Sequence, residues 1–183
     1  TINKASAAGG NVFGISSTST GYWTAIFCAV DQGTSNTAQT AILVRRRSST
    51  GRSINAAGTI NAGGNDYAEY MTKAVTDTIE KGDIVGINSS GLLTNVFSES
   101  ISFVVKSTDP SYVGGDSWGN DLNETDLEIE RAKVDRIAFS GQVPCNVTGA
   151  SVGDYIIPAA SSDGKITGEA VSDPTFEQYK ISV

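Results

Sequence analysis

Residues 63–70 read Gly-Gly-Asn-Asp-Tyr-Ala-Glu-Tyr, and the chain changes character across them. The linker that leads into this stretch, residues 55–64, has almost no side chains able to pack, so it predicts an extended connection. Two adjacent glycines also permit backbone angles that other residues avoid, which favours a strained bend at Gly63-Gly64. We therefore divide the chain into a first region, residues 1–64, and a second region, residues 65–183.

The first region predicts strands that cannot form a core alone. Short apolar clusters at residues 12–15, 22–30 and 41–44 alternate with Ser-, Gly- and Asn-rich loops, a pattern typical of β-structure. A segment of this size buries only about 60% of its unfolded surface even when it packs well. We therefore expect residues 1–64 to be an intertwined, oligomeric β stalk, in which each strand is buried against other copies of the chain.

The second region carries longer apolar strands. Ile101, Phe103 and Val105 alternate with other residues, as a half-buried strand requires. Residues 137–139 and 143–147 predict two further strands.

An internal similarity predicts two hairpins in this region. Residues 82–94 and 153–167 each run through a Gly-Asp turn, an apolar strand, a turn containing Ser-Ser and a second strand. The pair Asp163-Gly164 favours a type I′ turn. Two such hairpins suggest a compact barrel-like or sandwich-like body, although convergent turn chemistry would produce the same similarity.

One short helix is expected. Thr125 is followed three residues later by Glu128, which is a capping-box pattern, and it predicts a helix over residues 126–133. The predicted fold class is therefore mainly β: an oligomeric stalk followed by a compact β domain with at most one short helix.

Composition excludes several classes of function. The 183 residues carry a net charge of −7, whereas phosphate binding requires clustered Lys and Arg, so we expect no nucleic-acid partner. The one basic run, residues 45–47, is interpreted as a solvated face. No apolar run approaches the roughly 20 residues of a membrane span, so no membrane insertion is expected. The chain begins at Thr1 rather than at Met, and we expect it to be part of a longer protein.

The absence of histidine restricts the chemistry further. It removes Ser-His-Asp and Cys-His catalysis as well as His-ligated zinc. Cys28 and Cys145 fit no metal-ligand spacing and are expected to be buried thiols. The acidic residues in 116–130 lack the spacing of a calcium loop. We expect no metal and no cofactor, and any reaction must use carboxylates, hydroxyls or amides.

Asp66 and Glu69 are the candidate catalytic carboxylates. Peptide hydrolysis without a metal or His needs one carboxylate as base and another group to protonate the leaving amide. A helical turn or a bent strand would bring residues three apart to one side, and two close carboxylates separate their pKa values. Carboxylate pairs are common, however, so the spacing alone favours an ordinary role at the start of a domain.

The motif Asp-Tyr-Ala-Glu-Tyr after a linker of small residues resembles a known family. This is the autoproteolytic intramolecular chaperone domain at the C-terminus of phage appendages and tail fibres, of the pre-neck appendage type. The resemblance covers most of residues 60–183. It rests on the pentapeptide and on four further stretches, which are residues 81–85, 113–118, 141–144 and 152–158.

The resemblance implies a self-cleaving, single-turnover endopeptidase of the virion tail. Such a domain promotes the association of fibre subunits, by analogy a homotrimer, and then cuts itself off near the motif. Glu69 and Asp66 would be its catalytic residues, and the Asn65-Asp66 bond is the preferred site of the cut. Asn65 offers a second route, in which its side-chain amide attacks its own carbonyl carbon.

Two other interpretations stay open. The chain would instead be a non-cleaving fibre tip that binds a host carbohydrate receptor, with Tyr22, Trp23 and Trp118 stacking on sugar rings. Aromatic residues of this kind are more often core anchors. A purely structural fibre tip is the third interpretation.

Overall fold

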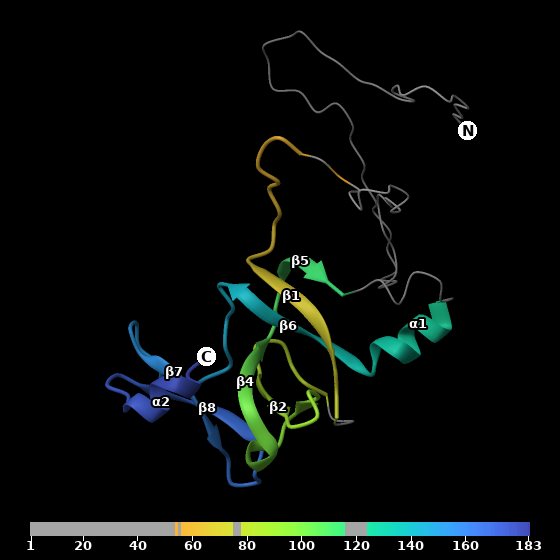
Figure 1. Cartoon of the computed structure of the whole chain (residues 1–183). Helices are drawn as coiled ribbons and strands as arrows, with labels where there is room; N and C mark the ends of the chain where they lie inside the picture. The colour runs from red at the N-terminus through yellow and green to blue at the C-terminus, as the bar shows by residue number, and fades with distance from the viewer. Residues whose placement is uncertain (1–53, 55, 75–77, 116–123) are drawn as a thin grey trace, which may run out of the picture. The chain divides into compact units, whose positions relative to one another are not determined.

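The structure is a computed structural model, and Figure 1 shows the course of the chain. It describes residue 54 and residues 56–74, 78–115 and 124–183. The chain divides into two compact units, residues 1–55 and 56–183. Nearly all of the first unit, with the strands and the oligomeric stalk expected there, lies outside the described residues. The predicted boundary after residue 64 stays a prediction.

The second unit is mainly β, as expected. One sheet contains six strands in the order β3-β2-β4-β6-β1-β5, in which the β1–β5 pair is parallel and the other pairs are antiparallel. These strands are β1 (Asp66–Thr72), β2 (Ile84–Asn88), β3 (Leu93–Thr94), β4 (Ser100–Lys106), β5 (Pro110–Gly114) and β6 (Val134–Gly141). A separate antiparallel pair consists of β7 (Tyr155–Ala160) and β8 (Ile166–Val171).

The six-stranded sheet curls into a half-barrel (Figure 1). Its curl brings the end of β1 to β3, although three strands separate them in the sheet order. Lys73 forms a bridge with Leu93, and the main-chain nitrogen of Ala74 donates to the Leu93 oxygen at 2.7 Å. The core that fills this curl contains Ile79, Val85, Leu93 and Ile137, with Met71, Ile87 and Val104 packed against it.

The predicted strand around Phe103 is confirmed as β4, but its faces differ from the prediction. Ile101 is 71% exposed, and Val104 packs against the core instead. Phe103 and Val105 line a cavity of about 430 Å³, of which Ile156 in β7 forms another part. Both faces of β4 are therefore apolar along its second half, so the alternation in the sequence does not identify the core side.

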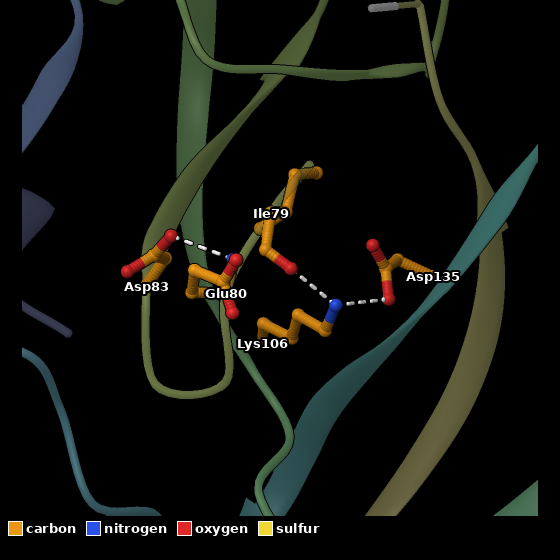
Figure 2. Close-up of polar contacts among 5 residues, drawn as sticks. All are labelled: Ile79, Glu80, Asp83, Lys106 and Asp135. Atoms are coloured by element: carbon orange, nitrogen blue, oxygen red, sulfur yellow. Dashed lines mark hydrogen bonds and ion pairs between the residues drawn. The ribbon is translucent and has the colours of Figure 1, made fainter. Parts of the chain in front are cut away.

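Lys106, the last residue of β4, connects this strand to β6 and to the segment before β2 (Figure 2). Its ammonium group donates to the main-chain oxygen of Ile79 and lies 2.7 Å from the Asp135 carboxylate in β6. The two charged side chains are only 18% and 14% exposed. Next to them, Asp83 accepts a hydrogen bond from the nitrogen of Glu80 at 2.8 Å, which closes the turn before β2.

Both predicted hairpins are confirmed, as β2–β3 and β7–β8. The predicted type I′ turn is wrong, because that turn needs a positive φ at Asp163, and within the described residues only glycines have one. Ser161 and Lys165 enclose a three-residue loop in which Gly164, with φ +80°, takes the left-handed conformation. The β2–β3 loop has the same hydrogen bonds and uses Gly91, with φ +75°.

The prediction of at most one short helix is wrong. Helix α1 (Glu124–Arg131) confirms the expected helix, but it begins and ends two residues earlier than predicted, so Thr125 lies within it and is not its N-cap. A second helix, α2 (Phe176–Ile181), follows a capping box in which Thr175 and Gln178 exchange hydrogen bonds. A 3₁₀ turn, η1 (Phe97–Glu99), precedes β4. Within the described parts of the chain, no helix is long and apolar enough to cross a membrane.

The strand predicted at residues 143–147 is absent. This segment crosses the turn before β2 instead of joining a sheet, and the Asn146 nitrogen donates to the Gly82 oxygen at 2.8 Å. The Asn146 side chain also donates to the Lys81 oxygen and to the Asp83 carboxylate, each at 2.8 Å. The turn before β2 therefore accepts hydrogen bonds from both the main chain and the side chain of Asn146.

Candidate active site

The motif Asp-Tyr-Ala-Glu-Tyr lies in β1, and the Asn65-Asp66 bond lies directly before this strand. β1 is held between β6, which pairs with it over its whole length, and β5, which pairs with its first four residues. The Tyr and Thr side chains of this segment favour a strand. Asp66 lies opposite Pro110 on one side and Gly141 on the other.

Two glycines allow the neighbouring backbone to approach the Asn65-Asp66 bond closely. A Cβ atom on Gly64 would lie 2.5 Å from the nitrogen of Ser111. A Cβ atom on Gly141, whose φ is +119°, would lie 2.5 Å from the carbonyl oxygen of Asn65. Only glycine fits at either position, so the bond is enclosed by main chain on two sides.

The strained bend predicted at Gly63-Gly64 is corrected by this geometry. Neither Gly63 nor Gly64 has a positive φ, so the pair does not hold the left-handed conformation reserved for glycine. Gly63 has no atom within 4 Å of its Cβ position. Gly64 is required for close contact with β5, and the nitrogen of Asn65 then donates to the Asp109 oxygen at 3.0 Å.

Asp66 is the most unusual group of the site. It is 1% exposed, and neither oxygen of its carboxylate has a hydrogen-bond partner among the described residues. Its main-chain oxygen accepts from the Ser111 hydroxyl at 3.1 Å. Burying a carboxylate without a partner costs free energy, because the group loses its hydration and forms no hydrogen bond that replaces it. Groups of this kind are typical of functional sites, where buried polar groups are left unsatisfied at a cost in stability.

Glu69 is held by a tyrosine. The hydroxyl of Tyr67 donates to Glu69 Oε1, and the Tyr67 ring stacks on Tyr112 of β5 at 5.6 Å. Gly114 pairs with Glu69, and a Cβ atom there would lie 2.7 Å from the Tyr67 hydroxyl. This hydrogen bond to Glu69 is the main cause that raises the pKa of Tyr67, and desolvation and the charges of Glu69 and Tyr112 add to it.

The structure does not bring the two carboxylates of one chain to the same side. Residues three apart in a strand point to opposite faces, so Asp66 is buried while Glu69 shares the other face with Tyr67. The irregularities of pairing lie in the neighbouring strands, where β5 has the extra residue Ser111 and β6 the extra residue Phe139. β1 itself therefore keeps its alternation, and the spacing argument made from a helical turn or a bent strand does not apply.

Other candidate groups lie away from this site or outside the described residues. Cys145 is a free, half-buried thiol, and burial together with the charge of Asp83 raises its pKa. Cys28 lies outside the described residues, as do the three aromatic residues of the carbohydrate-binding alternative. Where the chain is described, no three His, Cys, Asp or Glu side chains gather closely enough to hold a metal ion.

Three residues of the site were missed by sequence reasoning. Tyr67 lies two residues before Glu69, and this spacing places both side chains on one face once the segment is known to be a strand. Gly141 and Gly114 lie in stretches that the family resemblance included, but no role followed for either of them. Their importance depends on which strands flank β1, and local sequence does not specify this.

No protein-family model matches this chain, and no curated protein or solved structure is significantly similar to it. A function must therefore be inferred from the residues and their geometry. Those residues offer a buried carboxylate and a serine hydroxyl next to the Asn65-Asp66 bond, and a second carboxylate with a tyrosine hydroxyl on the other face of β1. This set is suited to acid–base chemistry on a peptide bond.

Proposed function

We propose that residues 65–183 are an intramolecular chaperone that drives the chain to form a homotrimeric phage tail fibre or spike and then cuts itself off at the Asn65-Asp66 bond. The fibre end, residues 1–64 together with Asn65, would remain in the virion tail, where the fibre contacts a host surface receptor. The observation that carries the proposal is the buried Asp66 carboxylate, which has no hydrogen-bond partner among the described residues and directly follows the bond.

The surroundings of the bond support this proposal. Asn65 is exposed and Asp66 is buried, so water reaches one side of the bond while the other lies within the fold. The main chain at Gly141 lies close to the Asn65 carbonyl and limits its movement. Holding the reacting groups in one molecule supplies effective molarities of roughly 10⁵–10⁸ M, so a single cut needs no separate substrate pocket.

The chemistry requires only water and carboxyl groups. A Glu69 carboxylate takes a proton from water, and the resulting hydroxide adds to the carbonyl carbon of Asn65. The bond between this carbon and the Asp66 nitrogen then breaks, and the nitrogen leaves as an amine with a proton from the Asp66 side chain, which enters this step as the carboxylic acid and ends it as the carboxylate. The products are a new carboxylate at Asn65 and a new amino terminus at Asp66.

Attack by the Asn65 side-chain amide is an alternative first step at the same bond. Its nitrogen would bond to the Asn65 carbonyl carbon and expel the Asp66 amine, which leaves a cyclic imide on the stalk fragment. That fragment would be lighter by one water molecule than the product of hydrolysis. Mass spectrometry of the stalk fragment immediately after cutting therefore separates the two routes.

The proposal is tested by following the purified full chain over time on a denaturing gel. We expect two fragments, and N-terminal sequencing of the released one should begin Asp-Tyr-Ala-Glu. Glu69→Gln should remain uncut but assembled. Glu169→Gln, which changes an exposed glutamate of β8, is the matched control and should be cut normally. A chain that stays whole under all conditions contradicts the function, and a different first residue contradicts the bond.

A further inference from the structure

The pairing of β1 determines how far Glu69 lies from the Asn65-Asp66 bond. β6 pairs with β1 from Asp66 to Thr72, and β5 pairs with it from Asp66 to Glu69, so this part of the strand is held from both sides. A strand advances by about 3.3 Å per residue, which places Glu69 about 10 Å along β1 from its first residue. The side chain of a glutamate is much shorter than this span.

The direction of the Glu69 side chain adds to the separation. It lies on the face of β1 that carries Tyr67, opposite the buried Asp66. Its carboxylate accepts the hydrogen bond from Tyr67 and lies over Gly114, where the absence of a side chain leaves room for it. In this fold, the carboxylate of Glu69 therefore does not reach the Asn65-Asp66 bond of its own chain.

The same arrangement leaves both halves of the reaction accessible to a second copy. Tyr112, which stacks on Tyr67 beside Glu69, is 67% exposed. Asn65 and the preceding residues 56–63 are also exposed, and they belong to no strand. One chain thus offers a carboxylate beside an exposed tyrosine, and a neighbouring chain offers a peptide bond whose Asn65 side is exposed.

We infer that each cut is made between chains: Glu69 of one copy acts on the Asn65-Asp66 bond of a neighbouring copy. This inference rests on the proposed function and specifies how its site is assembled. Glu69 of the first copy takes the proton from water, the hydroxide adds to the Asn65 carbon of the neighbour, and that neighbour's Asp66 nitrogen leaves with a proton from its own carboxyl group. The site is incomplete in a single chain, so cutting must follow assembly.

Mixed oligomers test this inference. A wild-type chain and an excess of Glu69→Gln chains, distinguished by tags of different mass, are co-expressed, and oligomers that contain both are purified through the two tags in turn. If the cut is made between chains, the Glu69→Gln chains are cut, in proportion to the wild-type chains present. The matched mixture contains Glu169→Gln in place of Glu69→Gln, and both of its chains should be cut.

The outcomes separate this inference from the proposed function. Cutting confined to the wild-type chains, or absent from the mixed oligomers, overturns the inference while wild-type homo-oligomers still cut themselves. Homo-oligomers of Glu69→Gln that are cut, or wild-type homo-oligomers that are not, overturn the proposed role of Glu69 instead. Sedimentation of the Glu69→Gln homo-oligomer verifies that the variant assembles.

Discussion

Gly141 meets two requirements at one position. Its φ of +119° lies in a region that side chains disfavour, and its backbone lies against the carbonyl oxygen of Asn65. A methyl group there would both strain the backbone and push the Asn65-Asp66 bond away from β6. The residue therefore connects the stability of the sheet to the position of the proposed cut.

Replacing Gly141 by alanine should lower the free energy of unfolding by about 1–3 kcal/mol and slow the cut, because the strain is local to the bond. Gly149→Ala is the matched control, since Gly149 has φ +74° but no atom within 4 Å of its Cβ position. It should cost about 1 kcal/mol and leave cutting unchanged. Urea unfolding and the cleaved fraction measure the two effects. Equal cutting in both variants would show that close contact at Gly141 has no role in processing.

The Tyr67–Glu69 hydrogen bond should give a pH dependence at alkaline pH. The pKa of Tyr67 is raised above its ordinary value of 10.0, chiefly by this bond. Its contribution to stability is therefore complete below pH 10.0 and is lost as the pH rises through the folded-state pKa, where the hydroxyl loses the proton that it donates. The difference in stability between wild type and Tyr67→Phe should be constant below pH 10.0 and shrink above it. A difference that disappears at lower pH would contradict this assignment.

Among the elements, β4 and β6 are joined by the Lys106–Asp135 ion pair (Figure 2). Asp135→Asn leaves the Lys106 ammonium group, which is only 18% exposed, without its carboxylate, and it should destabilise the fold by about 3 kcal/mol. Glu177→Gln is the control, because the Lys180–Glu177 pair is 48% and 77% exposed and should change stability by no more than about 0.5 kcal/mol. Thermal unfolding compares the two. Similar effects would mean that Lys106 is better solvated than the structure indicates.

Helix α2 should depend on its capping box. Thr175→Ala removes the side chain that accepts from the Gln178 nitrogen, and it should cost about 1 kcal/mol. Thr148→Ala changes an exposed threonine outside every helix and strand, and it should have almost no effect. Hydrogen exchange should show faster exchange of the α2 amides in Thr175→Ala alone. Unchanged exchange would mean that packing on β7 is sufficient to hold the helix.

How far the sequence predicts this fold differs from element to element. β4, β6 and the two hairpins follow from apolar periodicity and turn residues, because these signals are local. Residues 143–147 were predicted wrongly, since their apolar pattern resembles a strand while their hydrogen bonds go to the Gly82 turn. The candidate residues Asp66 and Glu69 could be chosen from the motif, but their separation on two faces follows only from β1 being a strand between β5 and β6.

For the whole molecule, the sequence predicts that residues 1–64 need other copies of the chain. Their apolar clusters are too sparse for a private core, so the full chain should sediment as an oligomer, with a trimer proposed by analogy. Sedimentation at micromolar concentration measures this directly. Residues 65–183 alone, whose core is Ile79, Val85, Leu93 and Ile137, are the comparison. A well-folded monomer of the full chain would remove the fibre interpretation.

The pairing of β1 also sets an order in time. β1 is the first strand of the sheet to be synthesised, yet the strands that enclose its first residue, β5 and β6, come much later in the chain. Such distant pairings form late, because the entropy of closing a long loop must be lost before the strands gain their stabilising contacts. The Asn65-Asp66 bond therefore comes to lie between β5 and β6 only after the ribosome has passed Gly141 and the sheet has closed. Under the proposed function, a chain that stops before β6 keeps its Asn65-Asp66 bond intact. The cut therefore occurs only in chains whose chaperone domain has been completed and folded.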